Sequence, residues 1–223
     1  MKKILFRADA KPSIGIGDLM SCINLSHYFI HAGWETHFII RSYNAGLELT
    51  KKYNVENLEI IDENIDIKTE VEHINAYIEK NKINITLFEI TERKLNDYQD
   101  VTNSGLKVCI NFDGIVPQDF SLIINWDIKA EEYYNFSQFK HTKFLLGPEY
   151  VILPYSFSNN PSISNRTYKM TPDTILIAMG GADEYNFTLK VVNTLINKRV
   201  ASKINIILGS GYYYTEELSE VLT

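Results

Sequence analysis

The sequence is poor in several features that mark specialised classes of protein. Cys22 and Cys109 are the only two cysteines among 223 residues. We expect both to be reduced and buried, which excludes a disulfide framework. The apolar run near the amino terminus, Ile4-Leu5-Phe6, is too short for a signal peptide or a membrane span. These scarcities predict a cytoplasmic protein that does not insert into a membrane.

Positive charge and metal-binding patterns are also scarce. The chain has 22 basic and 28 acidic side chains, a net charge of −6, and the charges are interspersed, which argues against nucleic acid as a partner. There is no nucleophile elbow, Walker lysine motif or zinc spacing. His27 and His31 lie one helical turn apart, but no Glu or Cys near them completes a ligand set. We therefore expect neither a metal ion nor an organic cofactor.

Hydrophobic residues make up 45% of the chain, enough for a substantial core. They form short apolar runs that alternate with segments of helical periodicity, a pattern typical of a parallel sheet covered on both faces. Strands are predicted at 3–7, 35–41, 58–61, 83–90, 106–112 and 122–125, and helices at 18–32, 45–53, 67–80 and 93–103. The first of these helices is expected to begin at Asp18 as a cap and to stop at Gly33.

The composition changes after Tyr155. Residues 156–171 are polar, contain proline and show no period, as expected of a linker between lobes. A new strand–helix–strand pattern follows at 174–179, 185–198 and 203–208, with a helix starting near 215. The region 172–223 is well short of a typical domain of roughly 100 to 150 residues. The sequence therefore predicts a first lobe over 1–155 and a second, incomplete lobe over 172–223.

Two glycine-containing turns join a strand to a helix. Gly15 and Gly17 follow the first strand, where glycines let the backbone approach a ligand and a helix N-terminus can face a phosphate or a sugar. Met20 occupies the place of the third glycine of a dinucleotide fingerprint, which argues against NAD or FAD. Gly180 and Gly181 repeat the device in the second lobe. At both places a tight turn without a ligand is the alternative interpretation.

An ordered set of motifs carries a resemblance to a known family: Arg7-Ala8-Asp9, Ile14-Gly15-Ile16-Gly17, Gly147-Pro148-Glu149-Tyr150, and Met179-Gly180-Gly181-Ala182-Asp183 with Asn186. With these motifs the chain resembles the UDP-sugar hydrolase of the pseudaminic acid pathway and its spore-coat polysaccharide relatives. The resemblance implies an α/β fold of two Rossmann-like lobes of GT-B type, the first on the sugar side and the second on the nucleotide diphosphate side. It spans almost the whole chain, with about half of the second lobe absent.

The chain departs from the family at four positions. Asp18 stands where the family has a histidine implicated in catalysis, and Ser21 stands where it has an arginine. Paired aspartates are represented by Asp113 followed by Gly114, and an expected arginine has become Pro154. Asp18 could act as a general base, because a carboxylate in a closed cleft can have its pKa raised toward neutrality. A simple helix cap is the alternative role for Asp18.

The resemblance implies release of UDP from an amino- or acetamido-deoxy sugar nucleotide in surface-polysaccharide or nonulosonic acid biosynthesis. The nucleotide sugar is then the partner, and Asp18 is the catalytic residue. The expected substrate-binding residues are Arg7, Asp9, Gly15, Gly17, Asp113 and Tyr150. The expected diphosphate-binding residues are Gly180, Gly181, Ala182, Asp183 and Asn186. Two alternatives stay open, a GT-B glycosyltransferase and a catalytically degenerate module that only binds a sugar nucleotide.

Overall fold

The chain forms two compact units in a computed structural model, Met1–Asn159 and Asn160–Thr223. We describe each unit by itself. The structure describes residues 1–11, 13–91, 93–102, 105–158, 173–181, 183–200, 203–209 and 211–222. Most of the expected linker, from 159 onward, lies outside the described residues.

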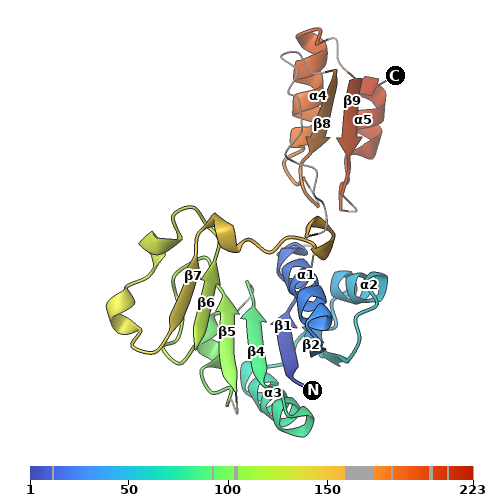
Figure 1. The fold of residues 1–223 in the computed structure, drawn as a ribbon. Coiled ribbons are helices and arrows are strands. Elements are labelled where there is room, and N and C mark those ends of the chain that lie inside the picture. Colours follow the sequence, from blue (N-terminus) through green and yellow to red (C-terminus); the bar gives the residue numbers. More distant parts are fainter. Residues whose placement is uncertain are drawn as a thin grey trace. The chain divides into compact units, whose positions relative to one another are not determined.

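The first unit is built on a seven-stranded sheet in the order β3-β2-β1-β4-β5-β6-β7 (Figure 1). All neighbouring strands pair in parallel, so the predicted α/β fold with a parallel sheet is confirmed. The strands are β1 Lys3–Ala8, β2 Glu35–Arg41, β3 Leu58–Ile61, β4 Ile85–Glu89, β5 Leu106–Ile110, β6 Leu122–Asn125 and β7 Lys143–Leu146. The sequence patterns predicted all of these strands except β7. That strand has only four residues, and they are exposed or partly buried.

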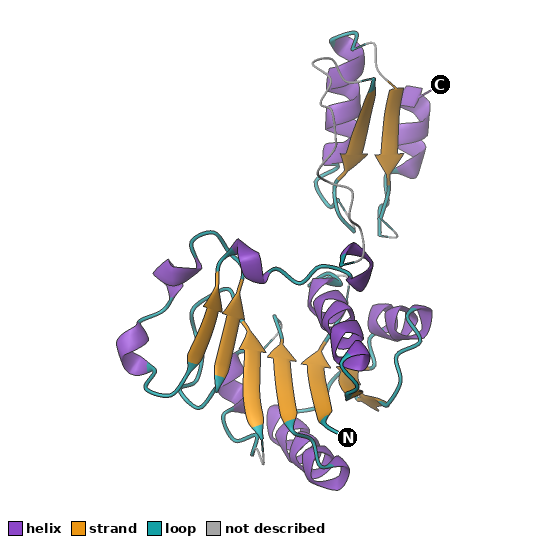
Figure 2. Cartoon of the chain, viewed as in Figure 1, coloured by secondary structure: helices purple, strands orange, loops and turns teal. Residues whose placement is uncertain are grey.

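Helices cover both faces of this sheet (Figure 2). Helices α1 (Gly17–His31) and α2 (Asn44–Lys52) pack on one face through residues such as Leu19 and Leu49. Helix α3 (Ile67–Asn81) packs on the other face through Val71, Ile74 and Ile78. Burial on both sides explains why the strands are nearly continuous apolar runs.

The stretch 93–103, predicted as a helix, forms only a short 3₁₀ turn, η1 (Leu95–Tyr98). Its buried side chains, Leu95, Tyr98 and Val101, recur every third residue. That spacing fits the three residues per turn of a 3₁₀ helix. The prediction of an α-helix here was therefore wrong.

The chain after β6 and after β7 is irregular. The turns η2 (Ala130–Tyr133) and η3 (Phe136–Gln138) precede β7, and η4 (Pro148–Tyr150) and η5 (Tyr155–Phe157) follow it. Figure 1 shows the segment after β7, in gold, returning to α1. There the Tyr28 hydroxyl donates to the Leu153 carbonyl at 3.2 Å, and the Tyr155 ring stacks on His31 with centroids 3.9 Å apart. The edge of the sheet is thereby tied to the helix beside β1.

The second unit consists of β8 (Thr174–Ala178), α4 (Phe187–Asn197), β9 (Lys203–Ile207) and α5 (Thr215–Leu222). The two strands pair in parallel, and both helices pack on the face that carries Ile177. The opposite face is open, with Leu176 62% and Ile207 58% exposed. Parallel sheets in folded domains are normally covered on both faces.

Candidate active site

A cleft in the first unit lies at the carboxyl ends of β4 and β5 and is also lined by Asp18 of α1, the helix that follows β1. β1 and β4 are neighbours in the sheet. The strand order reverses between these two strands, and ligands of open α/β sheets bind at such a switch point. The cleft has a volume of about 440 Å³ and is lined from α1, from the end of β4 with the segment after it, and from the end of β5 with the segment after it. Five ionisable residues line the cleft: Asp18, Glu89, Arg93, Lys94 and Asp113.

Asp18 lies in the first turn of α1 and does not cap it. The cap position is held by Ile16, which makes no side-chain cap bond, so the prediction of an Asp18 cap was wrong. One oxygen of the Asp18 carboxylate instead accepts from the N–H of Thr91 at 3.0 Å and from its hydroxyl at 2.7 Å. Burial raises the pKa of Asp18 above its usual value, and the two bonds from Thr91 oppose that rise. Asp18 is thus a partly desolvated carboxylate that faces the cleft.

Glu89 is a second carboxyl group of the cleft that the sequence patterns missed. It ends β4 and is 5% exposed, and the Cys22 thiol donates a weak hydrogen bond to it at 3.6 Å. Burial, with the charge of Asp18, raises the pKa of Glu89 well above its usual value, which shifts this group toward its protonated form. An acidic residue at the carboxyl end of an apolar parallel strand was the available signal.

Asp113 lies in the same cleft as Asp18, as the predicted roles require. Its carboxylate accepts from the side-chain amide of Asn111 at 2.7 Å and from the N–H of Ile115 at 2.8 Å. The adjacent Gly114 has φ +75°, and a Cβ there would meet the Tyr133 carbonyl oxygen at 2.2 Å. Asp113 therefore shapes a tight loop after β5 and also lines the cleft.

The first glycine turn precedes α1. Its backbone is closed by hydrogen bonds of the Gly15 N–H to the Lys11 carbonyl at 2.9 Å and of the Lys11 N–H to the Gly15 carbonyl at 3.2 Å. Gly15 has φ +80°, a conformation that favours glycine. Nothing lies within 4 Å of a Cβ added at Gly15 or Gly17. Both glycines therefore present open backbone at the start of the helix.

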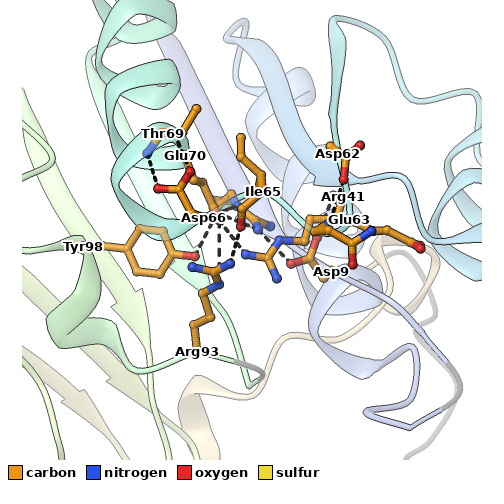
Figure 3. Close-up of polar contacts among 12 residues, drawn as sticks. Asp9, Arg41, Asp62, Glu63, Ile65, Asp66, Thr69, Glu70, Arg93 and Tyr98 are labelled. Atoms are coloured by element: carbon orange, nitrogen blue, oxygen red, sulfur yellow. Dashed lines mark hydrogen bonds and ion pairs between the residues drawn. The ribbon is translucent and has the colours of Figure 1, made fainter.

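Arg7 and Asp9 lie beneath the surface. The Arg7 side chain is 0% exposed and that of Asp9 is 1% exposed, and they form an ion pair at 2.8 Å. The Asp9 carboxylate also accepts from the N–H of Arg41 at 2.8 Å. Asp9 and Arg41 belong to the polar network in Figure 3, and bonds to protein groups already hold Arg7 and Asp9. At this position Arg7 and Asp9 can stabilise the carboxyl end of β1 from below, and their buried side chains are poorly placed for direct contact with a ligand.

Glu70 of α3 is the centre of this network (Figure 3). Its carboxylate oxygens lie 2.7 Å from Arg7 and 2.5 Å from Arg41, and one accepts from the Tyr98 hydroxyl at 2.8 Å. Burial alone would raise the pKa of Glu70, but these partners outweigh it and the pKa is lowered. Arg93, on the rim of the cleft, is 3.9 Å from the same carboxylate. The network thus joins β1, β2 and α3 to the loop after β4.

Tyr150 lies in η4, where its side chain is 38% exposed. It is not among the residues that line the cleft. The preceding Gly147 has φ +111°, so this turn depends on glycine. A substrate contact by Tyr150 stays a prediction.

The second glycine turn is arranged around Asp183. The Asp183 carboxylate accepts from the N–H groups of Phe187 and Thr188, each at 2.8 Å, so it occupies the first amides of α4. Asn186 caps α4 and its side-chain oxygen accepts from the Tyr212 hydroxyl at 2.9 Å. Nothing lies within 4 Å of a Cβ added at Gly180 or Gly181, while the Gly181 carbonyl accepts from the N–H of Gly211 at 2.9 Å. Ala182 lies outside the described residues.

Within the described residues, no group of three or more His, Cys, Asp or Glu side chains is placed to hold a metal ion. No helix in the described parts of the chain is long and apolar enough to cross a membrane. Cys22 and Cys109 are both buried free thiols, in agreement with the prediction.

Comparison with known proteins adds one relative and one structural neighbour. No protein-family model matches the chain. An uncharacterized protein of Methanocaldococcus jannaschii is 33% identical over 101 residues, which are 45% of this chain and 20% of that protein. The chain thus spans about a fifth of that curated relative's length. The crystal structure of a glycosyltransferase from Rickettsia africae matches with a TM-score of 0.57 and 13% identity, over 94% of this chain and 68% of that one. This likeness shows a Rossmann-like α/β fold.

Proposed function

We propose that the chain handles a nucleotide-activated sugar and releases UDP from an amino- or acetamido-deoxy sugar nucleotide. The observation that carries this proposal is the Asp18 carboxylate, held by Thr91 in a cleft at the switch point of the sheet. The glycosyltransferase-like fold supports a role with sugar nucleotides, and the ordered motifs of the sequence support the hydrolase.

In the proposed reaction Asp18 acts as the general base. A water molecule bonds to the anomeric carbon while its proton passes to the Asp18 carboxylate, and the bond from that carbon to the diphosphate oxygen breaks. UDP leaves with the electron pair. A raised pKa brings Asp18 closer to the operating pH, where a general base is most effective. The raised pKa of Glu89 favours its protonated form, which reduces the negative charge beside Asp18.

The other predicted residues take roles that follow their positions. The open backbone at Gly15 and Gly17 and the carboxylate of Asp113 would face the sugar. Arg7 and Asp9 would hold the end of β1 from beneath.

In the second unit the diphosphate would be bound by the backbone of Gly180 and Gly181, together with Ala182. Asp183 and Asn186 would fix that turn, because Asp183 already occupies two amides of α4. A two-lobed GT-B architecture with an incomplete second lobe is part of the proposal, and the uncovered face of the β8–β9 sheet supports it.

Glycosyl transfer is the second candidate, and the Rickettsia africae neighbour, a glycosyltransferase, favours it. The same base would then take its proton from an acceptor hydroxyl instead of water. Phosphorus NMR with UDP-2,4-diacetamido-trideoxyhexose separates the candidates. Free UDP formed without an acceptor supports hydrolysis, and UDP formed only after an acceptor is added supports transfer. Shifted phosphorus signals without turnover would indicate that the chain only binds the sugar nucleotide. An unchanged spectrum would refute the proposal for this substrate.

A further inference from the structure

Arg93 stands on the rim of the cleft and is anchored from behind. It follows β4 in the chain, and one terminal nitrogen of its guanidinium donates to the Ile65 carbonyl at 2.5 Å. Its Nε lies 3.9 Å from the Glu70 carboxylate. These contacts come from the α3 side of the sheet, so the guanidinium is oriented before any ligand binds (Figure 3).

The charge of Arg93 is poorly matched by the protein. Glu70 lies within 2.5–2.7 Å of Arg41 and Arg7, whereas its contact to Arg93 is too long for a hydrogen bond. A guanidinium has five N–H donors in a planar fork, and the described residues engage one of them. The Arg93 side chain is 22% exposed and lines the cleft. Donors remain for a group inside the cleft.

The remaining charges of the cleft fall into two kinds. Lys94 adds a second cation to the same stretch of wall. The cleft also has three acidic side chains. Asp18 and Asp113 each accept two hydrogen bonds from protein groups, and Glu89 is buried. Protein donors thus already engage Asp18 and Asp113, while Lys94 is exposed and Arg93 is partly exposed. A ligand with both hydroxyls and a negative group would match this wall.

We propose that Arg93 and Lys94 form an anion subsite in the first unit, which binds a carboxylate or phosphate group of a sugar or of an acceptor. Arginine matches both groups through paired N–H donors. The subsite is additional to the proposed diphosphate contacts of the second unit. The subsite does not depend on the proposed release of UDP, and its test measures binding of probes that do not react.

The test compares three small probes that bind without reaction: N-acetylglucosamine 1-phosphate, glucuronic acid and neutral N-acetylglucosamine. Calorimetric or NMR titration of the full chain measures each affinity. We expect at least one charged probe to bind about tenfold or more tightly than the neutral sugar. The phosphate and carboxylate probes show which anion the subsite takes.

Variants then assign the effect to the subsite. Arg93→Met should lower the affinity for the preferred anionic probe about tenfold and leave the affinity for the neutral sugar unchanged. The affinity of Arg93→Lys for the anionic probe should lie between those of Arg93→Met and the wild type. Lys68→Met removes an exposed cation of α3, 85% exposed, and should change none of the affinities. The melting temperature of each variant shows whether it is folded. If Arg93→Met does not fold, Lys94→Met, which changes an exposed residue, takes its place in the test.

Three results would overturn the proposal. Equal affinity for charged and neutral probes would do so, and so would the absence of binding by any probe at millimolar concentration. Weakening of all three probes by the same factor in Arg93→Met would also contradict it, because that pattern marks Arg93 as a clamp that only holds the loop after β4.

Discussion

Asp18 on α1 and Thr91 after β4 are joined by two hydrogen bonds to one carboxylate oxygen, from the Thr91 N–H at 3.0 Å and from its hydroxyl at 2.7 Å. The pair ties the first turn of a helix to the end of the neighbouring strand. It also leaves the other carboxylate oxygen of Asp18 outside these two bonds. The proposed base is therefore positioned by the switch point of the sheet itself.

Thr91→Val should shift the pH dependence of activity. The Thr91 hydroxyl stabilises the charged form of Asp18, so its loss should raise the pKa of Asp18 further. A general base must be deprotonated, so the acidic limb of the kcat/KM profile should move to higher pH. Activity should fall several-fold at acidic pH and little at alkaline pH. Thr194→Val, at an exposed threonine of α4, is the control, and coincident profiles for all three proteins would refute the expectation.

Glu89→Gln should change how stability depends on pH. The pKa of Glu89 is raised well above its usual value in the folded protein, so above about pH 4.5 the unfolded chain loses this proton while the folded one keeps it. The native protein then loses stability as pH rises from there to the folded pKa, by at most about 1.4 kcal/mol per pH unit from this group.

Glutamine lacks this titration, so the Glu89→Gln variant should gain stability relative to the wild type between pH 5 and pH 8. Urea unfolding at the two pH values measures the difference. A constant difference between the two proteins would show that Glu89 is ionised in the native state.

Glu70→Gln should be strongly destabilising. Removing the carboxylate takes one negative charge from a buried group that contains Arg7, Arg41 and Asp9, and breaking a buried pair in this way typically costs about 3 to 5 kcal/mol. Glu72→Gln lies on the same helix at an exposed position and should change the free energy of unfolding by less than about 0.5 kcal/mol. Similar values for both variants in chemical denaturation would contradict the central place given to Glu70.

Asp183→Ala should loosen the start of α4. The carboxylate accepts from Phe187 and Thr188, and loss of such a cap costs about 1 kcal/mol. Amide hydrogen exchange in the first turn of α4 should become roughly five-fold faster. Glu184→Ala, which removes a neighbouring exposed carboxylate, should leave exchange unchanged. Equal protection in both variants would mean that the turn does not depend on Asp183.

The architecture of the first unit could be predicted because the signals are local. Buried parallel strands read as apolar runs, and the 3–4 spacing of Leu19, Cys22 and Ile23 marks one face of α1. These statements need no knowledge of side-chain contacts. Asp18 and Asp113 were named from the family resemblance, and the structure places both in one cleft.

Tertiary contacts decided the rest. Asp18 looked like a cap because its partner, Thr91, lies 73 residues away. Arg7 and Asp9 looked available to a ligand, but α3 brings Glu70 over them. Glu89 and Arg93 belong to no motif, and their roles arise from burial against Cys22 and from the Ile65 carbonyl.

Turnover by Asp18→Asn tests the central claim most directly. Phosphorus NMR follows UDP release from UDP-2,4-diacetamido-trideoxyhexose for the wild type, for Asp18→Asn, and for Asp97→Asn at an exposed residue outside the cleft as a control. Asparagine keeps an acceptor for Thr91 but cannot take a proton. We expect a rate loss on the order of 10²- to 10⁴-fold for Asp18→Asn and no loss for Asp97→Asn. Release of UDP at the wild-type rate by Asp18→Asn would contradict the account.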